Sequence, residues 1–287
     1  MPPEIKNSYK LSESIGCILK RWPELAEEED NITPVFIFSA GWGSGSTLLQ
    51  RLVMSSQDIL VWGEPLDHAF LIPKLGDFIA CIDSEWPPDR FFNTEHRLDK
   101  LAGSWIANLT PPMSYLKSSH RSLFTTWLGD SAFERGASRW GIKEVRFTID
   151  HARYLKWLFP KARFLFLYRN LYKSYLSIKN TGWYNSWPKY RMDNPIGFAN
   201  HWKYLLNGFL QSYQEVDGLL IKYEDLISGK FNIDQIAEHI GVQSIDHGVM
   251  EKKIRARGHK QKLSMYEYLV LKNTGGHLLD ELGYQKD

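Results

Sequence analysis

The sequence has little of what redox, metal or membrane chemistry would need. It contains two cysteines, Cys17 and Cys81, in 287 residues, which is too few for a disulfide framework and favours a reduced compartment. No spacing of Cys and His resembles a structural zinc site. No run approaches the roughly 18 apolar residues of a membrane-spanning helix, and the N-terminus lacks the pattern of a signal peptide. We therefore expect a cytoplasmic protein without a metal or a membrane span.

Neither sign of charge is in excess. The chain has 35 Lys and Arg against 33 Asp and Glu, a formal net charge of +2, so its charge does not indicate a nucleic-acid partner. An anionic ligand would have to be bound by basic groups that cluster locally. The hydrophobic fraction of 43%, with no internal repeat or low-complexity linker, indicates one large domain with a core.

Short apolar runs alternate with helical patterns along the chain. The runs lie at 34–40, 59–62, 140–143, 163–168 and 219–222, and helical patterns at 150–159, 171–179 and 196–216 separate the later ones. This alternation predicts a three-layer α/β fold, with a mostly parallel sheet and helices on both faces. Ligands of such sheets bind at the carboxyl ends of the strands.

We expect residues 1–287 to form a single domain with four additions to the alternating pattern. A leading amphipathic helix lies within residues 1–33, and a mostly helical insertion spans 65–139. A loop at 182–195 is a possible lid, and the basic segment 250–262 either forms a solvated helix face or closes over a ligand. Within the loop, the aromatic cluster Trp183, Tyr184 and Trp187 either stacks on an acceptor or pins the loop by packing.

The segment Gly41-Trp-Gly-Ser-Gly-Ser-Thr47 lies between a predicted strand and a predicted helix. Glycines permit a tight turn with inward N–H groups, and the helix N-terminus adds partial positive charge, so the segment predicts a phosphate site. A nucleoside triphosphatase is not favoured, because its motif has Lys where this chain has Ser46. A dinucleotide site stays open: the alternating glycines come close to its fingerprint, and Glu64 follows about 20 residues later.

A second anion-binding signal follows the predicted strand at 163–168. Arg169 comes directly after this strand, and Ser177 lies on the next predicted helix. An arginine at a strand's carboxyl end faces the ligand crevice, and a serine two turns along the helix can reach the same side. Alone, Arg169 would suggest a surface ion pair. Together with the glycine loop it predicts a ligand with two anionic groups, which an NAD(P)-dependent oxidoreductase would leave unexplained.

Several segments in this order resemble the sulfotransferases that use 3′-phosphoadenosine 5′-phosphosulfate (PAPS) and release 3′-phosphoadenosine 5′-phosphate (PAP). They are Gly43-Ser-Gly-Ser-Thr-Leu-Leu49, Gly63-Glu64, Ile142-Lys-Glu144, Leu158-Phe-Pro-Lys-Ala-Arg-Phe-Leu-Phe-Leu-Tyr-Arg169 and Lys222-Tyr-Glu-Asp-Leu226. The resemblance covers roughly residues 34–262 and is greatest to the tyrosylprotein and bacterial branch. It implies a P-loop-like nucleotide site and transfer of a sulfuryl group to a hydroxyl or amine.

The resemblance also implies the residues that bind the nucleotide. The 5′-phosphosulfate would lie on the loop of Gly43, Ser44, Gly45, Ser46 and Thr47. Arg169 and Ser177 would bind the 3′-phosphate, and Tyr223 would lie near the nucleotide. A basic loop that closes over the 3′-phosphate is matched loosely by Arg255, Arg257, Gly258 and Lys260.

Sulfuryl transfer needs a group that takes the proton of the acceptor hydroxyl. The resemblance implies Glu64 as this general base and Lys143 as the cation that stabilises charge on the sulfuryl group. His68, four residues after Glu64, is a second candidate base. A purely structural role, as a cap or in an ion pair, stays open for Glu64. Neither the acceptor, whether small molecule, glycan or peptide, nor the oligomeric state follows from the sequence.

One position departs from the family pattern. Sulfotransferases have Lys or Arg immediately before the Ser-Gly-Thr/Ser-Thr segment, where this chain has Gly43. The loss of one preorganised donor costs about 3 kcal/mol in other enzymes, a hundredfold or more in rate. Lys143 is the first candidate to compensate, with Arg51 or Arg146 behind it. The alternative is a catalytically impaired protein that binds PAPS or PAP.

Overall fold

A five-stranded, all-parallel sheet forms the centre of the computed structural model, which describes residues 8–26, 31–65, 69–92, 97–181, 194–251 and 261–284. Its strands are β1 (Val35–Ser39), β2 (Ile59–Trp62), β3 (Arg139–Glu144), β4 (Arg163–Tyr168) and β5 (Gly218–Lys222). They lie in the order β2-β3-β1-β4-β5. The predicted parallel sheet is confirmed, and each strand lies within two residues of its predicted run.

The central strand β1 is buried on both faces. Phe36 and Phe38 pack into the core on one side of the sheet, and Val35 and Ile37 pack into the core on the other. Strands buried on both faces read as continuous apolar runs, which is why the sequence marks them so clearly. In the register, Phe38 is level with Glu144 of β3 and with Phe166 of β4, so the carboxyl ends of these strands meet at one edge.

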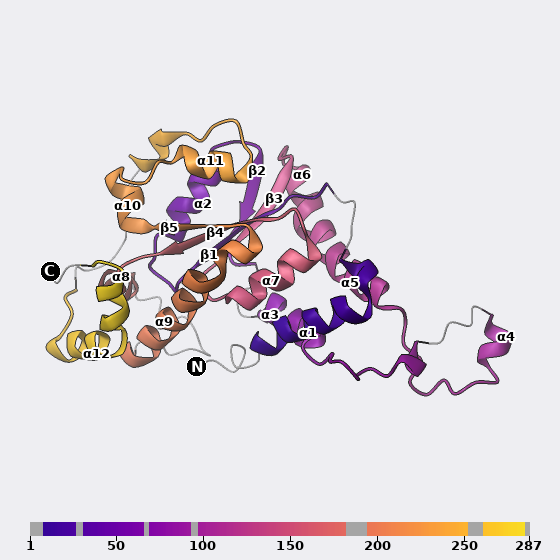
Figure 1. Cartoon of the computed structure of the whole chain (residues 1–287). Helices are drawn as coiled ribbons and strands as arrows, with labels where there is room; N and C mark the ends of the chain where they lie inside the picture. Colours follow the sequence, from indigo (N-terminus) through magenta and orange to yellow (C-terminus); the bar gives the residue numbers. More distant parts are fainter. Residues whose placement is uncertain are drawn as a thin grey trace.

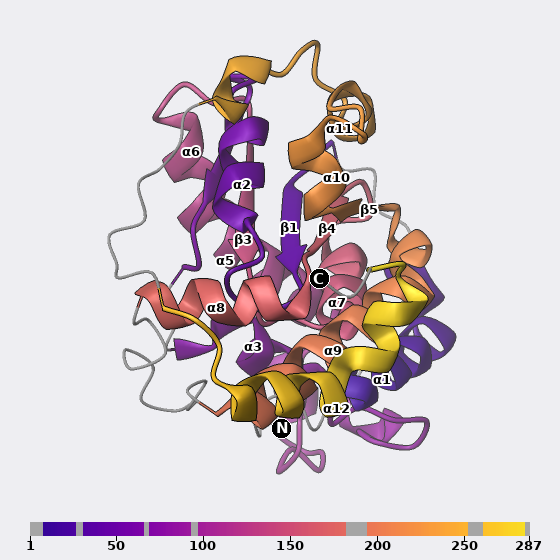
Figure 2. The ribbon, with the colours of Figure 1, turned by 90° about the vertical axis from the view of Figure 1, so that its left-hand side faces the viewer.

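Helices cover both faces of the sheet (Figure 1). One face is covered by α2 (Ser46–Met54), α10 (Tyr223–Ser228) and α11 (Asp234–Ile240). The other face is covered by α1 (Ser8–Arg21), α3 (Leu71–Ile79), α7 (Ile149–Leu158), α9 (Pro195–Ser212) and α12 (Met265–Glu281). Helix α8 (Leu171–Thr181) lies across the carboxyl ends of the central strands (Figure 2). The three-layer α/β prediction is therefore confirmed.

The stretch between β2 and β3 contains α3 and then a long excursion. After the short helix η4 (Asp89–Phe91) and α4 (Leu98–Leu101), a helical segment runs through α5 (Met113–Phe124), a π-helical turn (Thr125–Asp130) and α6 (Ser131–Phe133). This helical segment packs beside β3, and α4 projects away from the body of the protein (Figure 1).

Within the described ranges, no helix combines the length and apolarity that crossing a membrane requires. In the same ranges, no three acidic, His or Cys side chains gather as metal ligands would. Cys17 and Cys81 are both free thiols.

Candidate functional site

The glycine loop joins β1 to α2 at the carboxyl edge of the sheet. Gly41, Gly43 and Gly45 have φ angles of 84°, 71° and 92°, in the left-handed region where glycine is favoured. Gly45 precedes α2, and its carbonyl accepts the first hydrogen bond of the helix from Leu48 N at 2.9 Å. The alternating glycines therefore turn the chain sharply into the N-terminus of α2.

The loop presents free backbone donors. From Gly43 to Thr47, the N–H groups donate to no acceptor in the described part of the chain. Consecutive unpaired N–H groups at a helix N-terminus form an anion-binding cradle. The Ser44 hydroxyl already takes part in a hydrogen bond, because it lies 2.6 Å from the buried Ser39 hydroxyl. The Ser39 hydroxyl also donates to Gly41 O at 3.1 Å.

Arg169, directly after β4, is directed at this loop. Its Nη1 donates to the carbonyl oxygen of Gly43 at 2.8 Å, and its guanidinium carbon lies 4.5 Å from the centroid of the Tyr223 ring. Its Nε is buried without a hydrogen-bond partner among the described residues. A buried charged donor without a partner is costly, so an anion at this point would complete the bonding of Arg169.

Helix α8 and Tyr223 close around the same loop. A Cβ atom at Gly43 would lie 2.5 Å from the carbonyl oxygen of Ser174 and 3.0 Å from the Cβ of Ser177, and one at Gly45 would overlap the Tyr223 ring. These clashes show how closely the three elements approach one another. The predicted loop, Arg169, Ser177 and Tyr223 are therefore neighbours in space.

Glu64 and Lys143 form an ion pair at the same edge of the sheet. Lys143 is in β3, level with Ile37 of β1, and Glu64 follows the end of β2. Their side chains are 9% and 17% exposed, so solvent screens the pair only weakly. In such a pair, the carboxylate of Glu64 can accept a proton, and the ammonium group of Lys143 can stabilise negative charge that develops nearby.

A model of the sulfotransferase family matches residues 34–246, which is most of the chain. The chain belongs to the sulfotransferase family. No curated protein matches it. Family membership does not favour the dinucleotide alternative that the glycine spacing left open.

Three solved structures illustrate the similarity. The sulfotransferase domain from the curacin biosynthetic pathway is 14% identical, with a TM-score of 0.48, and the match covers 89% of this chain and 99% of that one. The sulfotransferase domain of the Synechococcus PCC 7002 olefin synthase is 18% identical, with a TM-score of 0.45 and coverages of 91% and 98%. A sulfotransferase from Alicyclobacillus acidocaldarius is 14% identical, with a TM-score of 0.44 and coverages of 88% and 96%.

In this sulfotransferase, helix α8 takes the space that a side chain at position 43 would need. The Ser174 carbonyl and the Ser177 side chain stand where the family's basic residue would begin. Arg146, one candidate to compensate, is 5% exposed, and its guanidinium donates to both carboxylate oxygens of Glu144 at 2.8–3.2 Å. Arg146 is therefore paired with Glu144 in the same way that Lys143 is paired with Glu64.

Two polar residues that support the loop were missed in the sequence. Ser39 ends the buried strand β1 and bonds Ser44, and its position at the end of an apolar run is a signal that could have been used. His201 of α9 is 3% exposed, and its ring lies 5.1 Å from that of Trp42. Burial lowers the pKa of His201 to about 4, so its ring is neutral at physiological pH.

Several predicted residues lie outside the described ranges. They are His68, the basic residues Arg255, Arg257 and Lys260 with Gly258, and the aromatic cluster Trp183, Tyr184 and Trp187. Their assignments stay predictions.

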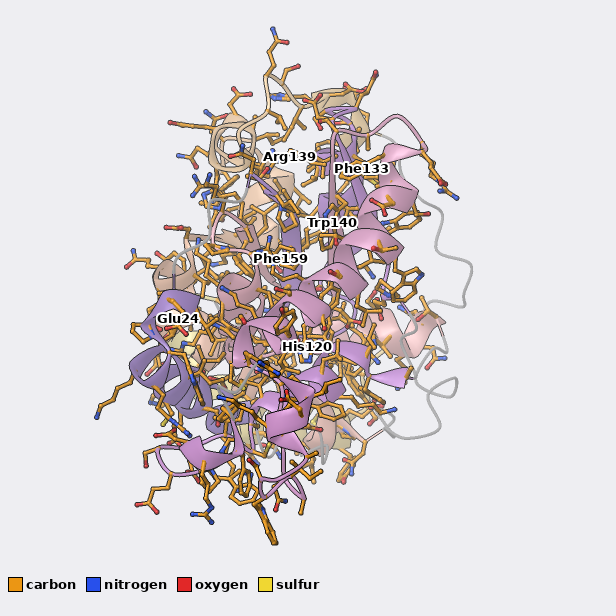
Figure 3. All side chains as sticks on the ribbon, turned by 90° about the vertical axis from the view of Figure 1, so that its right-hand side faces the viewer. Glu24, His120, Phe133, Arg139, Trp140 and Phe159 are labelled. Carbon is orange, nitrogen blue, oxygen red and sulfur yellow. The ribbon has the colours of Figure 1, made fainter. Side chains whose placement is uncertain are left out.

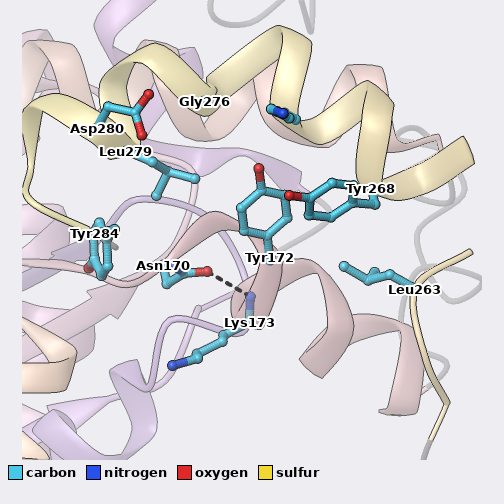
Figure 4. Close-up of a pocket in the computed structure, with 10 residues that line it drawn as sticks. Asn170, Tyr172, Lys173, Leu263, Tyr268, Gly276, Leu279, Asp280 and Tyr284 are labelled. Carbon is cyan, nitrogen blue, oxygen red and sulfur yellow. Dashed lines mark hydrogen bonds between the residues drawn. The ribbon is translucent and has the colours of Figure 1, made fainter. Parts of the chain in front are cut away.

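A cavity of about 260 Å³ lies between the start of α8 and α12 (Figure 4). It contains none of the predicted site residues, but one of its walls holds the turn that carries Arg169. Asn170 N donates to Glu224 Oε1 at 3.1 Å, Tyr284 donates to the same carboxylate at 2.8 Å, and Asn170 Oδ1 accepts from Lys173 N at 3.2 Å. These bonds, with the Trp202 indole on the Arg169 carbonyl at 3.1 Å, fix the backbone of Arg169.

A second hollow, of about 300 Å³, lies beside Glu64. It is lined by Trp62, Gly63, Pro65, Trp127, Leu128, Ser131 and Arg135. The π-helical turn forms one wall, and the Trp62 indole donates to the Leu128 carbonyl in this turn at 2.9 Å. The Arg135 guanidinium stacks 5.3 Å from the Trp62 ring. We call this hollow the tryptophan groove.

Proposed function

We propose that this sulfotransferase moves a sulfuryl group from PAPS to a hydroxyl, or an amine, of an acceptor that binds in the tryptophan groove. The observation that carries the proposal is the hydrogen bond from Arg169 to Gly43 O, because it joins two anion-binding elements. A nucleotide with phosphates at its 3′ and 5′ positions matches two such elements side by side.

The residues present fit this donor. The free N–H groups from Gly43 to Thr47, with the hydroxyls of Ser46 and Thr47, would hold the 5′-phosphosulfate. The buried Nε of Arg169 and the neighbouring Ser177 would hold the 3′-phosphate. When bound, PAPS supplies a sulfuryl group already activated by its link to phosphate.

Glu64 takes the acceptor proton in this proposal, and Lys143 stabilises the charge that develops on the sulfuryl oxygens. Transfer of this kind passes through a loose, in-line transition state, so the protein contributes mainly position and charge. The ion pair suits both tasks, because it fixes the position of the Glu64 carboxylate and places a cation beside the reacting groups. Lys143 then replaces the cation that position 43 lacks.

The shape and lining of the tryptophan groove suit an acceptor with a flat ring. Two indoles and a proline offer apolar surface for an aromatic or sugar ring, and the groove reaches Gly63 and Pro65 on either side of Glu64. The cytoplasmic location expected from the sequence, whose two cysteines are too few for a disulfide framework, belongs to this proposal.

The test is a transfer assay with PAPS that carries a label in its sulfuryl group. The acceptors are 4-nitrophenol, 2-naphthol, glucosamine and a tyrosine-containing peptide. We expect labelled product with at least one ring-bearing acceptor, and a raised acceptor KM in Trp127→Ala with unchanged affinity for PAP. Trp86→Ala, which removes an exposed indole outside the groove, is the matched control. Tight PAP binding without transfer to any acceptor would instead indicate the impaired nucleotide-binding protein that Gly43 suggests.

A further inference from the structure

Residues 97–112, which we call the arm, extend away from the body of the protein (Figure 1). Only Leu101 and Thr110 of the arm are even partly buried, and helix α4 within it has no buried side chain. A helix this short is not stable by itself in water. Fixing each backbone residue also costs about 1–2 kcal/mol of conformational entropy, so an ordered arm needs a surface to pack against.

The arm carries large apolar side chains that are exposed in the described structure. Leu98 is 82% exposed, Trp105 72%, Ile106 51% and Leu109 43%. Single exposed apolar residues are ordinary on protein surfaces, but a cluster on one projecting segment marks an interaction site.

The base of the arm directs it away from the body of its own chain. Pro-Pro pairs, Pro87-Pro88 and Pro111-Pro112, stand on the two sides of the base, and proline restricts the backbone of each. Thr110 N donates to Phe91 O at 2.9 Å, which ties the two sides together. Arg21 of α1 bonds the Pro87 carbonyl at 2.5 Å and the Asp89 carboxylate at 2.8 Å, which anchors the base to the body.

The helical segment from α5 to α6 presents an apolar face without a partner among the described residues. Tyr115 is 67% exposed, Leu123 39% and Phe133 46%. Figure 3 views this side of the molecule and labels Phe133 near one end of the segment. The arm leads directly into α5 at Met113, so the arm and this face, which we call the α5 face, are adjacent.

We propose that two copies of this chain form a dimer by exchanging arms, with the arm of each copy packed on the α5 face of the other. A two-fold axis beside α5 satisfies both surfaces at once, because each copy supplies one arm and one face. This pairing leaves neither apolar surface exposed.

The available area agrees with a dimer. Trp105 alone can bury up to about 200 Å², and the four apolar side chains of one arm together offer on the order of 400–500 Å². Two arms on two faces then bury roughly 1,600–2,000 Å² in total, the standard size of a stable interface.

The charge of the arm favours a protein surface over an anionic membrane. Arg97 pairs with Asp99 at 2.9 Å, so the arm does not carry the basic cluster that recognises acidic lipids.

The test is analytical ultracentrifugation of the full chain and three variants. The arm variant carries Leu98→Ser and Trp105→Ser, and the face variant carries Leu123→Ser and Phe133→Ser, which leaves Trp127 intact. We expect the unaltered chain to dimerise at micromolar concentration and each variant to dissociate at least tenfold more readily. Ile227→Ser on α10, 49% exposed in the unaltered chain, is the matched control and should dimerise normally.

Mixing the two variants makes the test specific. The arm variant keeps an intact face and the face variant keeps an intact arm, so a mixture regains one of the two contacts and should form more dimer than either variant alone. Hydrogen exchange on the unaltered chain gives an independent reading that needs no variant: amides of 97–112 should become more protected as protein concentration rises.

A chain that stays monomeric up to 100 µM, or an arm variant that dimerises as well as the unaltered chain, would overturn the proposal. Binding of the monomer to phosphatidylcholine–phosphatidylserine vesicles through the arm would overturn it in favour of a membrane surface.

Discussion

The guanidinium of Arg169 donates to the carbonyl oxygen of Gly43 at 2.8 Å, across 126 residues of sequence. This bond places the residue that ends β4 against the loop that follows β1, and it leaves the Arg169 Nε buried without a partner among the described residues. The account of the site depends on this proximity, and the predictions below test its parts.

Restoring a cation at position 43 should destabilise the protein. A Cβ there would meet the Ser174 carbonyl at 2.5 Å, and the φ angle of +71° strains any L-residue. We expect Gly43→Lys to lower the free energy of unfolding by about 2–4 kcal/mol. Gly136→Lys is the matched control, because Gly136 has a φ of +84° but open space around its Cβ position; it should lose only about 1–2 kcal/mol. Denaturant titration measures both, and equal losses would show that α8 does not exclude a side chain at position 43.

Removing the charge of Glu64 should abolish most of the turnover and spare nucleotide binding. General-base catalysis contributes roughly 10²–10⁴ in rate, so we expect kcat of Glu64→Gln to fall at least a hundredfold at unchanged affinity for PAP. Glu238→Gln, at an exposed carboxylate of α11, is the control. Turnover within a few-fold of the unaltered enzyme would remove Glu64 from the role of base.

Lys117 makes stability depend on pH. Its ammonium group is fully buried and donates to Leu25 O at 2.7 Å, and burial lowers the pKa of Lys117 from 10.5 to about 8. Between pH 8 and pH 10.5 the unfolded chain binds more protons at this lysine than the folded protein does. Its contribution to stability therefore rises with pH across that window, by at most about 1.4 kcal/mol per pH unit.

Replacing Lys117 by Met should flatten this dependence. The difference in the free energy of unfolding between the unaltered chain and Lys117→Met, followed by denaturant titration from pH 7 to pH 10.5, isolates this lysine from the other groups that titrate there. A difference that stays constant over the whole range would show that Lys117 keeps its ordinary pKa.

The sheet and the neighbourhood of Arg169 could be predicted from the sequence because both depend on local patterns. Strands buried on both faces give apolar runs, and an arginine directly after such a run must lie at the carboxyl edge. The family resemblance singled out Glu64 and Lys143 separately, but their ion pair, across 79 residues of sequence, was not predicted.

Other features depend on how distant elements pack, which a local pattern does not record. That Gly43 has no room for a side chain follows from the position of α8, which begins 128 residues later in the sequence (171 against 43). Arg146 looked available as a compensating cation, but it is buried with Glu144 beneath the Phe70 ring, 5.1 Å from its guanidinium. The insertion at 65–139 was expected to be mostly helical, and nothing in its pattern indicated a projecting arm.

The central claim is that one nucleotide is held at both of its phosphate ends, and calorimetric titration with PAP and 5′-AMP tests it most directly. PAP should bind at least 30-fold more tightly than 5′-AMP, because charge-assisted bonds to the 3′-phosphate contribute about 2–3 kcal/mol. Arg169→Ala should remove this preference and leave the affinity for 5′-AMP unchanged, whereas Arg163→Ala, at the other end of β4, should retain it. Equal affinity of the unaltered protein for the two nucleotides, or a preference that survives in Arg169→Ala, would contradict the account.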